Sequence, residues 1–275
     1  MSIKSADDFY TLLCAFPSVK YLTFGFVSFP QSILAAFPSP PQELRLETLD
    51  LRFYYNFIHS AMPFLQEGLS EILEDLKHLR VAHMTNRELQ LVKLILCQTR
   101  ESLISAYIGP MMLGNAESQQ HTNDPILLLS LSHVKYLTVV IGETDPYTST
   151  QILDRDLLET FSTDDENFKL KEFTTNLKVH VERSDSSLSA SFPSVAQWSA
   201  LDAALSRSQM KELCGVNLNL TVDSGSGYDP QLETLFARVR GIIEDSCKSL
   251  MSRDLLRISK YCSDIESATF SKKDR

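Results

Sequence analysis

The chain has few glycines, nine in 275 residues, and none of them forms a phosphate-binding pattern. A nucleotide phosphate needs glycines spaced as G-x-G-x-x-G or G-x-x-x-x-G-K-S/T, because the backbone must approach it closely. The run at 223–227, Asp-Ser-Gly-Ser-Gly, also lacks the glycine two places before the serine that a nucleophile elbow requires. We therefore expect no cofactor and interpret this run as a turn.

Cysteine is scarce and shows no paired spacing. Five cysteines, an odd number, stand at positions 14, 97, 214, 247 and 262 without a CxxC pair. We expect reduced, mostly packed thiols, not a disulfide or zinc framework. The six histidines form no HExxH motif, and the acidic run at 164–166 lacks the ligand spacing of an EF-hand loop. The sequence therefore predicts no bound metal.

Positive charge is also in deficit. Lysine and arginine number 26 against 35 aspartates and glutamates, which gives a net charge of −9. Binding to a nucleic-acid backbone needs clustered basic residues, so we do not expect nucleic acid as the main partner. No apolar run approaches eighteen residues, and residues 1–8 hold no apolar signal-peptide core. We expect a cytoplasmic or nuclear protein with no membrane partner.

The chain does contain an internal repeat. Residues 19–23 and 134–138 both read Val-Lys-Tyr-Leu-Thr. Alignment on this repeat reveals apolar residues at relative positions one, four, six and sometimes eight, the alternation of a short buried strand. This frame occurs eight times: Val19, Leu22, Phe24, Phe26; Leu46, Leu49, Leu51, Phe53; Leu76, Leu79, Val81; Leu103, Ala106, Ile108; Val134, Leu137, Val139, Ile141; a shifted copy, Phe173, Leu177, Val179, Val181; Leu213, Val216, Leu218, Leu220; and a degenerate copy, Leu255, Ile258.

Segments with helical spacing separate these frames. The leading residues of the frames are 27, 30, 27, 31, 39, 40 and 42 apart, and the first four intervals lie near the range of leucine-rich repeats. The apolar stripes between them are Phe9, Leu12, Leu13, Phe16; Ile33, Leu34, Phe37; Ile58, Met62, Leu65 towards Ile72, Leu73; Leu89, Val92, Ile95, Leu96; Trp198, Leu201, Leu205; and Leu232, Leu235, Phe236, Val239, Ile242, Ile243. Alternating strands and helices predict parallel strands joined by crossovers.

These patterns predict one α/β domain over residues 1–275. We expect a leucine-rich-repeat-like solenoid, or horseshoe, of about eight irregular repeats, with parallel strands on the concave side and helices on the convex side. A chain that is 43% hydrophobic can bury a substantial core, and a solenoid grows in one dimension without dividing into domains.

Four stretches carry a resemblance to a known group of proteins. The frames of Leu46 and Leu76, the phrase Phe-Pro-Ser-Val-Lys-Tyr-Leu-Thr at 16–23, and the segment from Trp198 through Asp202 to Leu213 resemble the leucine-rich-repeat region of the F-box-like families of mushroom-forming fungi. The resemblance implies a surface that recognises a protein partner. It also implies an N-terminal F-box that docks to the adaptor subunit of a cullin ubiquitin ligase.

Two departures from those families change the expectation. No F-box-like segment precedes the first repeat, so docking to the adaptor is in doubt, and the apolar stripe that begins at Phe9 has no polar cap. We expect a relative that lacks its F-box, or an end that another chain covers. The asparagine that follows the last core leucine in regular horseshoes is replaced by Val27, Tyr54, Met84 and Met111, which excludes that asparagine ladder.

The residues between the core positions are expected to point away from the helices. They are Thr23, Asp50, Arg52, Arg80, Tyr107, Thr138, Lys178, His180, Asn217 and Asn219, preceded by Lys20, Tyr21, Lys77, His78, Lys135 and Tyr136. Aromatic and arginine side chains supply large contact areas and forked hydrogen bonds. We therefore predict that a protein partner binds at Tyr21, Arg52, Arg80, Tyr107 and Tyr136; a solvated face with tyrosines that merely favour strands is the alternative.

The leading functional prediction is a non-catalytic protein-interaction scaffold, the recognition part of an F-box-type ubiquitin-ligase receptor without its F-box. The alternative is a small-molecule enzyme, hydrolase-like, on a repeat scaffold, which would use loop residues such as Asp154, Asp156 and His180. No recognisable motif brings a nucleophile, a base and an orienting group together, so the scaffold is preferred and no catalytic residue is assigned.

Overall fold

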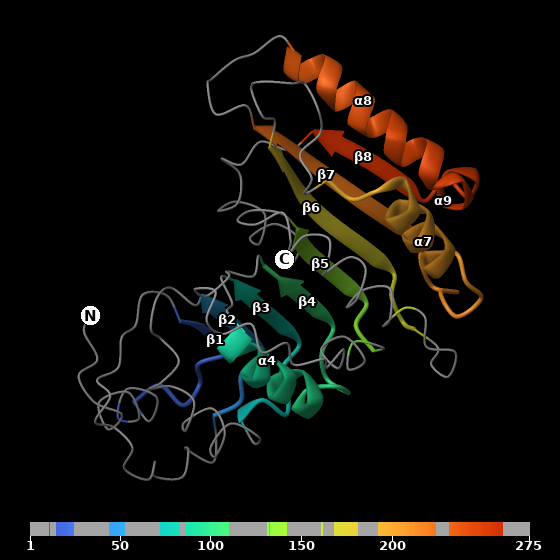
Figure 1. Ribbon diagram of the computed structural model, residues 1–275. Coiled ribbons are helices and arrows are strands. Elements are labelled where there is room, and N and C mark those ends of the chain that lie inside the picture. The colour runs from blue at the N-terminus through green and yellow to red at the C-terminus, as the bar shows by residue number, and fades with distance from the viewer. Residues whose placement is uncertain are drawn as a thin grey trace.

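A computed structural model describes residues 11, 15–24, 44–52, 72–82, 86–109, 131, 133–141, 161, 168–180, 192–223 and 231–260. Within these residues the chain forms one eight-stranded sheet (Figure 1). The strands are β1 (Tyr21–Phe24), β2 (Thr48–Arg52), β3 (His78–Ala82), β4 (Ser105–Ile108), β5 (Tyr136–Ile141), β6 (Glu172–His180), β7 (Gly215–Asp223) and β8 (Leu256–Lys260).

All strand pairs are parallel, and the strands follow one another across the sheet in chain order from β1 to β8. Because crossovers between parallel strands are right-handed, a one-way order places the connections on one face of the sheet. The predicted α/β class with parallel strands is confirmed. Each of the eight apolar frames contains or overlaps one strand.

Four helices are described along this sheet. They are α4 (Asn86–Gln98), α7 (Val195–Leu205), α8 (Gln231–Ser246) and the short α9 (Lys248–Ser252). Figure 1 shows α4 beside the first strands and α7, α8 and α9 beside the last. The stripes at 89–96, 198–205 and 232–243 predicted the first three. The stripes at 9–16, 33–37 and 58–65 lie almost wholly outside the described residues. None of the described helices is long and apolar enough to cross a membrane.

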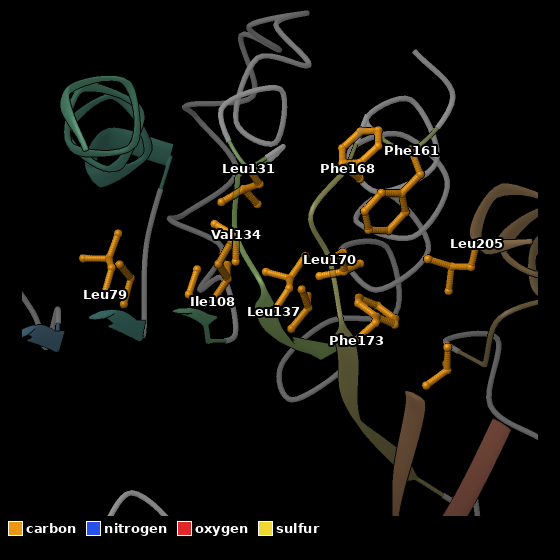
Figure 2. Packing of buried hydrophobic residues seen from close by; sticks show 14 of the residues in the cluster. Leu79, Ile108, Leu131, Val134, Leu137, Phe161, Phe168, Leu170, Phe173 and Leu205 are labelled. Carbon is orange, nitrogen blue, oxygen red and sulfur yellow. The ribbon is translucent and has the colours of Figure 1, made fainter. Parts of the chain in front are cut away.

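The core lies between the sheet and the helices. In the frames of β2 to β7, the residues at positions one, four and six are buried, and the apolar ones among them form one continuous cluster with buried residues of the helices. Figure 2 shows part of it, where Leu137 and Phe173 from neighbouring strands lie beside Leu170. Phe161 packs edge-on against Phe168 and Phe173 at 5.8 and 5.9 Å between ring centroids. This burial of apolar area is the main stabilising contribution.

The frame of β6 differs from the predicted one. Strand pairing sets Phe173 against Leu137 and Val216, both of which hold frame position four. The copy therefore begins at Leu170, which is 2% exposed, and the prediction that Phe173 leads a shifted copy was wrong. The cause is Thr175, which occupies the core position where the other copies carry Val139 and Leu218.

The frame of β8 was also wrong. Leu256 pairs with Val216, and Ile258 pairs with Leu218, so these two residues hold positions four and six. Leu255, predicted to lead the frame, is only half-buried. Just before it, Asp254 adopts φ 54°, a left-handed conformation that aspartate tolerates better than most residues. This single residue turns the chain from α9 into the last strand.

A buried carboxylate joins α7 to α9. Asp202, 6% exposed, accepts hydrogen bonds from the backbone N–H groups of Ser249 (3.0 Å) and Leu250 (2.8 Å). These donors belong to the first turn of α9, where no intrahelical acceptor is available. Burial, and then the nearby Asp202 carboxylate, raises the pKa of the Cys247 thiol to about 12. Asp202 therefore has a structural role in this chain.

The cysteines fit the expected state only in part. No described cysteine forms a disulfide, but only Cys247 is packed; Cys97 and Cys214 are exposed. The expectation of mostly packed thiols was therefore wrong for two of the three cysteines in the described part of the chain. Cys214 lies at the start of β7, where its Sγ donates to the carbonyl oxygen of Lys171 at 3.1 Å. Positions 14 and 262 lie outside the described residues.

Candidate binding surface

The sheet face turned away from the core carries three transverse rows of residues, which we call the outward face. Strand pairing aligns residues of neighbouring strands in each row, and the second row runs across all eight strands. The first row is Tyr21, Thr48, His78, Ser105, Tyr136, Glu172 and Gly215; the second is Thr23, Asp50, Arg80, Tyr107, Thr138, Thr174, Asn217 and Arg257; the third is Arg52, Ala82, Val140, Asn176, Asn219 and Ser259. The five predicted contacts therefore share one face.

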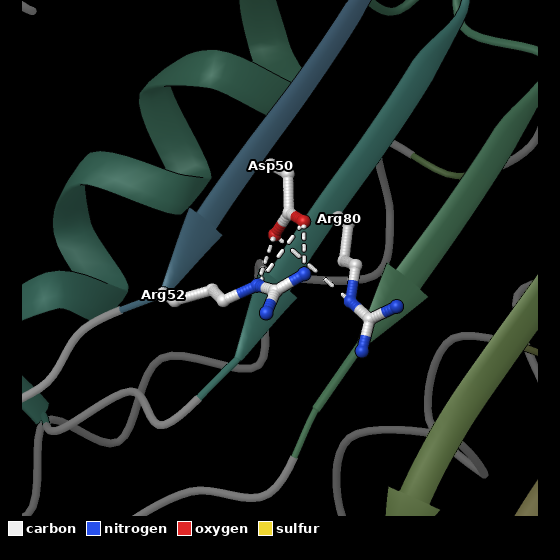
Figure 3. A network of polar contacts seen from close by, with 3 residues as sticks. All are labelled: Asp50, Arg52 and Arg80. Atoms are coloured by element: carbon white, nitrogen blue, oxygen red, sulfur yellow. Dashed lines mark hydrogen bonds and ion pairs between the residues drawn. The ribbon is translucent and has the colours of Figure 1, made fainter. Parts of the chain in front are cut away.

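Asp50, Arg52 and Arg80 form an ionic cluster on β2 and β3 (Figure 3). The guanidinium of Arg52 contacts the Asp50 carboxylate through Nε at 3.2 Å and Nη2 at 2.9 Å. From the neighbouring strand, Arg80 Nε lies 3.9 Å from Asp50 Oδ1. Asp50 is 9% exposed, so two arginines hold one nearly buried carboxylate. A forked guanidinium satisfies such a carboxylate better than a lysine would.

Arg80 also stacks on the next strand. Its guanidinium carbon lies 4.4 Å from the centre of the Tyr107 ring, which is a cation–π contact. The Arg80 side chain is 15% exposed, against 41% for Arg52. Asp50, Arg80 and Tyr107 thus form a continuous chain of contacts over β2, β3 and β4. Arg80 is therefore largely covered within this surface, and Arg52 is more exposed to solvent.

The two tyrosines of the repeated pentapeptide are the most exposed predicted contacts. Tyr21 is 70% exposed and Tyr136 is 46% exposed, and both occupy the first row. Large exposed aromatic side chains are unfavourable in water and favourable at protein interfaces. His78, between them in the same row, pairs through Nδ1 with Ser105 Oγ at 2.8 Å. The surface therefore displays a tyrosine at β1 and another at β5.

A second regular feature lies next to the first row. From β1 to β7, we call the residue immediately before each first-row residue a strand-start position; these are Lys20, Glu47, Lys77, Ile104, Lys135, Lys171 and Cys214. Each backbone carbonyl from Lys20 to Lys135 accepts two N–H groups from the next strand; Lys20, for example, accepts from Glu47 at 2.9 Å and Thr48 at 3.0 Å. The carboxylate of Glu47 binds Lys20 at 2.6 Å and lies 3.6 Å from Lys77. The Lys20–Glu47 bond raises the pKa of Lys20 and lowers that of Glu47.

The later strands carry a ladder of neutral side chains in place of the ionic cluster. Asn219 Nδ2 donates to Asn176 Oδ1 at 2.8 Å, and Ser259 Oγ donates to Asn219 Oδ1 at 2.7 Å. In the second row, Asn217 Nδ2 donates to Glu172 Oε1 at 2.7 Å. These amides cross three strands and connect β6, β7 and β8. We call Asn176, Asn219 and Ser259 the amide ladder.

Sequence reasoning placed Asn217 and Asn219 on this face but missed Thr174 and Asn176. A usable signal was present, because Asn176 and Asn219 are 43 residues apart, the distance from Leu170 to Leu213. The error in the β6 frame hid this equality. The positions 27, 54, 84 and 111, where an asparagine ladder was excluded, lie outside the described residues.

Of the residues named for the enzyme alternative, the structure describes only the backbone of His180. Asp154 and Asp156 lie outside the described residues, and His180 ends β6. Among the described residues, no three His, Cys, Asp or Glu side chains are grouped as metal ligands. Comparison with models of protein families, with curated proteins and with solved structures gave no match.

Proposed function

We propose that this chain is a non-catalytic protein-interaction scaffold whose outward face binds a protein partner. The observation that carries the proposal is the pair of exposed tyrosines, Tyr21 and Tyr136, aligned in one row of a continuous parallel sheet. A rigid sheet presents such side chains with little loss of conformational entropy on binding. The charged and forked groups of Arg52 and Asp50 in the neighbouring rows add directional contacts.

The one-way strand order supports the finer proposal of a leucine-rich-repeat-like solenoid. Each repeat supplies one strand, a buried apolar frame and, in several repeats, a helix on the other side of the core. In such an architecture the strands line the concave side, which is a suitable docking surface for a protein. From Lys20 to Lys135, the strand-start carbonyls join each repeat to the next by the same pair of hydrogen bonds.

The resemblance to the repeat region of fungal F-box-like proteins supports a more specific role. In this proposal the chain recognises a substrate for a cullin-type ubiquitin ligase. The genomic sequence upstream of the first codon tests this role directly. An F-box in the same reading frame supports it, and its absence from the mature transcript contradicts docking to the adaptor.

Site-specific crosslinking tests the binding face. p-Benzoylphenylalanine replaces Tyr21 or Tyr136 on the outward face, or Val195 or Met251 on the helix side, and the purified chains are irradiated in extract from the native host. Val195 and Met251 are matched controls, because they are 60% and 43% exposed against 70% and 46% for the tyrosines. We expect the same crosslinked protein, identified by mass spectrometry, from Tyr21 and Tyr136 only. Equal yields from Val195 and Met251 would contradict the proposal.

A further inference from the structure

The outward face and the adjoining strand-start positions together carry a charge opposite to that of the whole chain. The three rows and the strand-start positions contain seven lysines and arginines against three acidic residues, whereas the whole chain has a net charge of −9. The acidic residues are Glu47, Asp50 and Glu172, and each of them contacts a described residue of the same surface. A basic surface on an acidic protein attracts an acidic partner and orients it during approach.

The lysines at the strand starts follow a spacing. Lys20, Lys77 and Lys135 immediately precede the alternate strands β1, β3 and β5, and Lys171 immediately precedes β6. Neighbouring strands lie about 4.8 Å apart, so lysines on alternate strands are about 10 Å apart, which equals about three residues of an extended peptide. Lys135 and Lys171 are direct neighbours and form no ion pair with any residue that the structure describes. Two adjacent like charges repel and are relieved by an anion between them.

We infer that the outward face takes an acidic, extended segment of a partner protein, with a carboxylate at about every third residue. The segment crosses the strands along the strand-start positions from Lys20 to Lys171. The exposed rings of Tyr21 and Tyr136 pack against its uncharged side chains. This inference rests on the proposed function and specifies the chemistry of the partner.

A peptide fits this surface better than a nucleic acid does. Glu47 lies between Lys20 and Lys77 and contacts both, and Asp50 lies behind it in the second row. A nucleic acid carries a charge on every nucleotide, so its phosphates would be forced against these carboxylates. An acidic peptide can place an uncharged residue opposite Glu47 and a carboxylate opposite each lysine.

Fluorescence anisotropy with short labelled peptides tests the inference. Five strand spacings from β1 to β6 cover about 24 Å, which about seven extended residues span. The probe is an eight-residue peptide, about that length, with Glu at every third position and Ser or Thr between; the reference peptide has Gln in place of each Glu. We expect the Glu peptide to bind, the Gln peptide not to bind, and binding to weaken as sodium chloride is raised.

Charge variants locate the binding. The variant Lys135→Glu with Lys171→Glu should bind the Glu peptide about tenfold more weakly. The control Lys248→Glu with Arg253→Glu makes the same change in net charge at two exposed basic residues, one in α9 and one at its C-cap, and should bind normally. Lys135→Gln with Lys171→Gln removes the charges without reversing them, in case the first variant does not fold.

Three outcomes overturn the inference: equal binding of the Gln peptide, equal weakening by the control variant, or tighter binding of a single-stranded oligonucleotide of the same length. The crosslinking result separates this failure from that of the proposed function. If Tyr21 and Tyr136 crosslink a partner while the Glu peptide does not bind, the inference falls and the scaffold function stands. If positions Tyr21 and Tyr136 crosslink only proteins that Val195 and Met251 also crosslink, the proposed scaffold function itself is wrong.

Discussion

The first four strands and the last four share one parallel register and one apolar frame, yet their outward faces differ in chemistry. Over β2, β3 and β4 the surface is charged and aromatic, held by Asp50 between two arginines and by Arg80 on Tyr107. Over β6, β7 and β8, amides and hydroxyls form hydrogen bonds across the strands, and the charged residues in these rows are Glu172 and Arg257. The frame fixes the fold, and the residues between its positions are available to carry different surfaces.

The two halves also differ in how closely their strands approach at glycine. A Cβ on Gly109, just after β4, would lie 2.8 Å from Ala82 Cα and 2.9 Å from the Val81 carbonyl oxygen. Both of these atoms belong to the backbone and cannot move aside. A Cβ on Gly215, at the start of β7, would meet only Glu172 Cγ at an ordinary 3.8 Å.

The largest expected effect follows from that contrast. Gly109→Ala should lower the free energy of unfolding by about 3 kcal/mol, because β3 and β4 must separate to admit the methyl group. Gly215→Ala should change it by less than about 1 kcal/mol. Urea unfolding followed by circular dichroism measures both. Similar losses for the two variants would show that the halves do not differ in backbone approach.

The second prediction compares the ionic cluster with the amide ladder. Asp50→Ala should cost about 2 kcal/mol at low salt, because it removes charge-assisted bonds and leaves Arg52 and Arg80 as neighbouring like charges. Asn219→Ala removes two neutral hydrogen bonds and should cost about 1–2 kcal/mol.

The salt dependence of stability distinguishes the loss of unfolding free energy in Asp50→Ala from that in Asn219→Ala. Added sodium chloride screens the repulsion between the remaining arginines, so the cost of Asp50→Ala should fall between 0.05 and about 1 M salt. The cost of Asn219→Ala should stay the same, because no charge is involved. Thermal unfolding of both variants at several salt concentrations gives the answer. A loss that is independent of salt in both would remove the electrostatic distinction between the halves.

The smallest effect concerns the core beneath the amide ladder. The Oγ1 of Thr175 is fully buried and has no hydrogen-bond partner. Thr175→Val keeps the shape and removes the unsatisfied hydroxyl, so it should stabilise the protein by about 1 kcal/mol. The reverse change in the preceding strand, Val139→Thr, should destabilise by a similar amount. A loss of stability in Thr175→Val would mean that the hydroxyl has a partner in solution.

Sequence periodicity predicted the parallel class, a strand in every frame and the helices α4, α7 and α8, because buried leucines and valines repeat at fixed spacings. It failed where a side chain breaks the pattern. Thr175 is polar at a core position, which displaced the β6 frame by three residues. The β8 frame failed because its start depends on the left-handed Asp254.

Other features depend on contacts between residues far apart in the chain. The five-residue helix α9 is too short to show periodicity, and it is capped by Asp202, 46 residues before Lys248. The outward direction of Arg52 and Arg80 was predictable from strand alternation. Their shared attachment to Asp50 was not, because the sequence does not say that Arg52 and Arg80 turn towards the same carboxylate.

The strand-start carbonyls have an evolutionary consequence. From Lys20 to Lys135, each strand-start carbonyl oxygen accepts two backbone N–H groups from the next strand, so these hydrogen bonds do not depend on the side chain at that position. Lysine, glutamate and isoleucine can therefore replace one another at these positions without altering the joint. Selection can change the charge pattern of this edge one residue at a time, and a duplicated repeat would connect to its neighbours without new compensating mutations. The two copies of Val-Lys-Tyr-Leu-Thr are what such a duplication would leave.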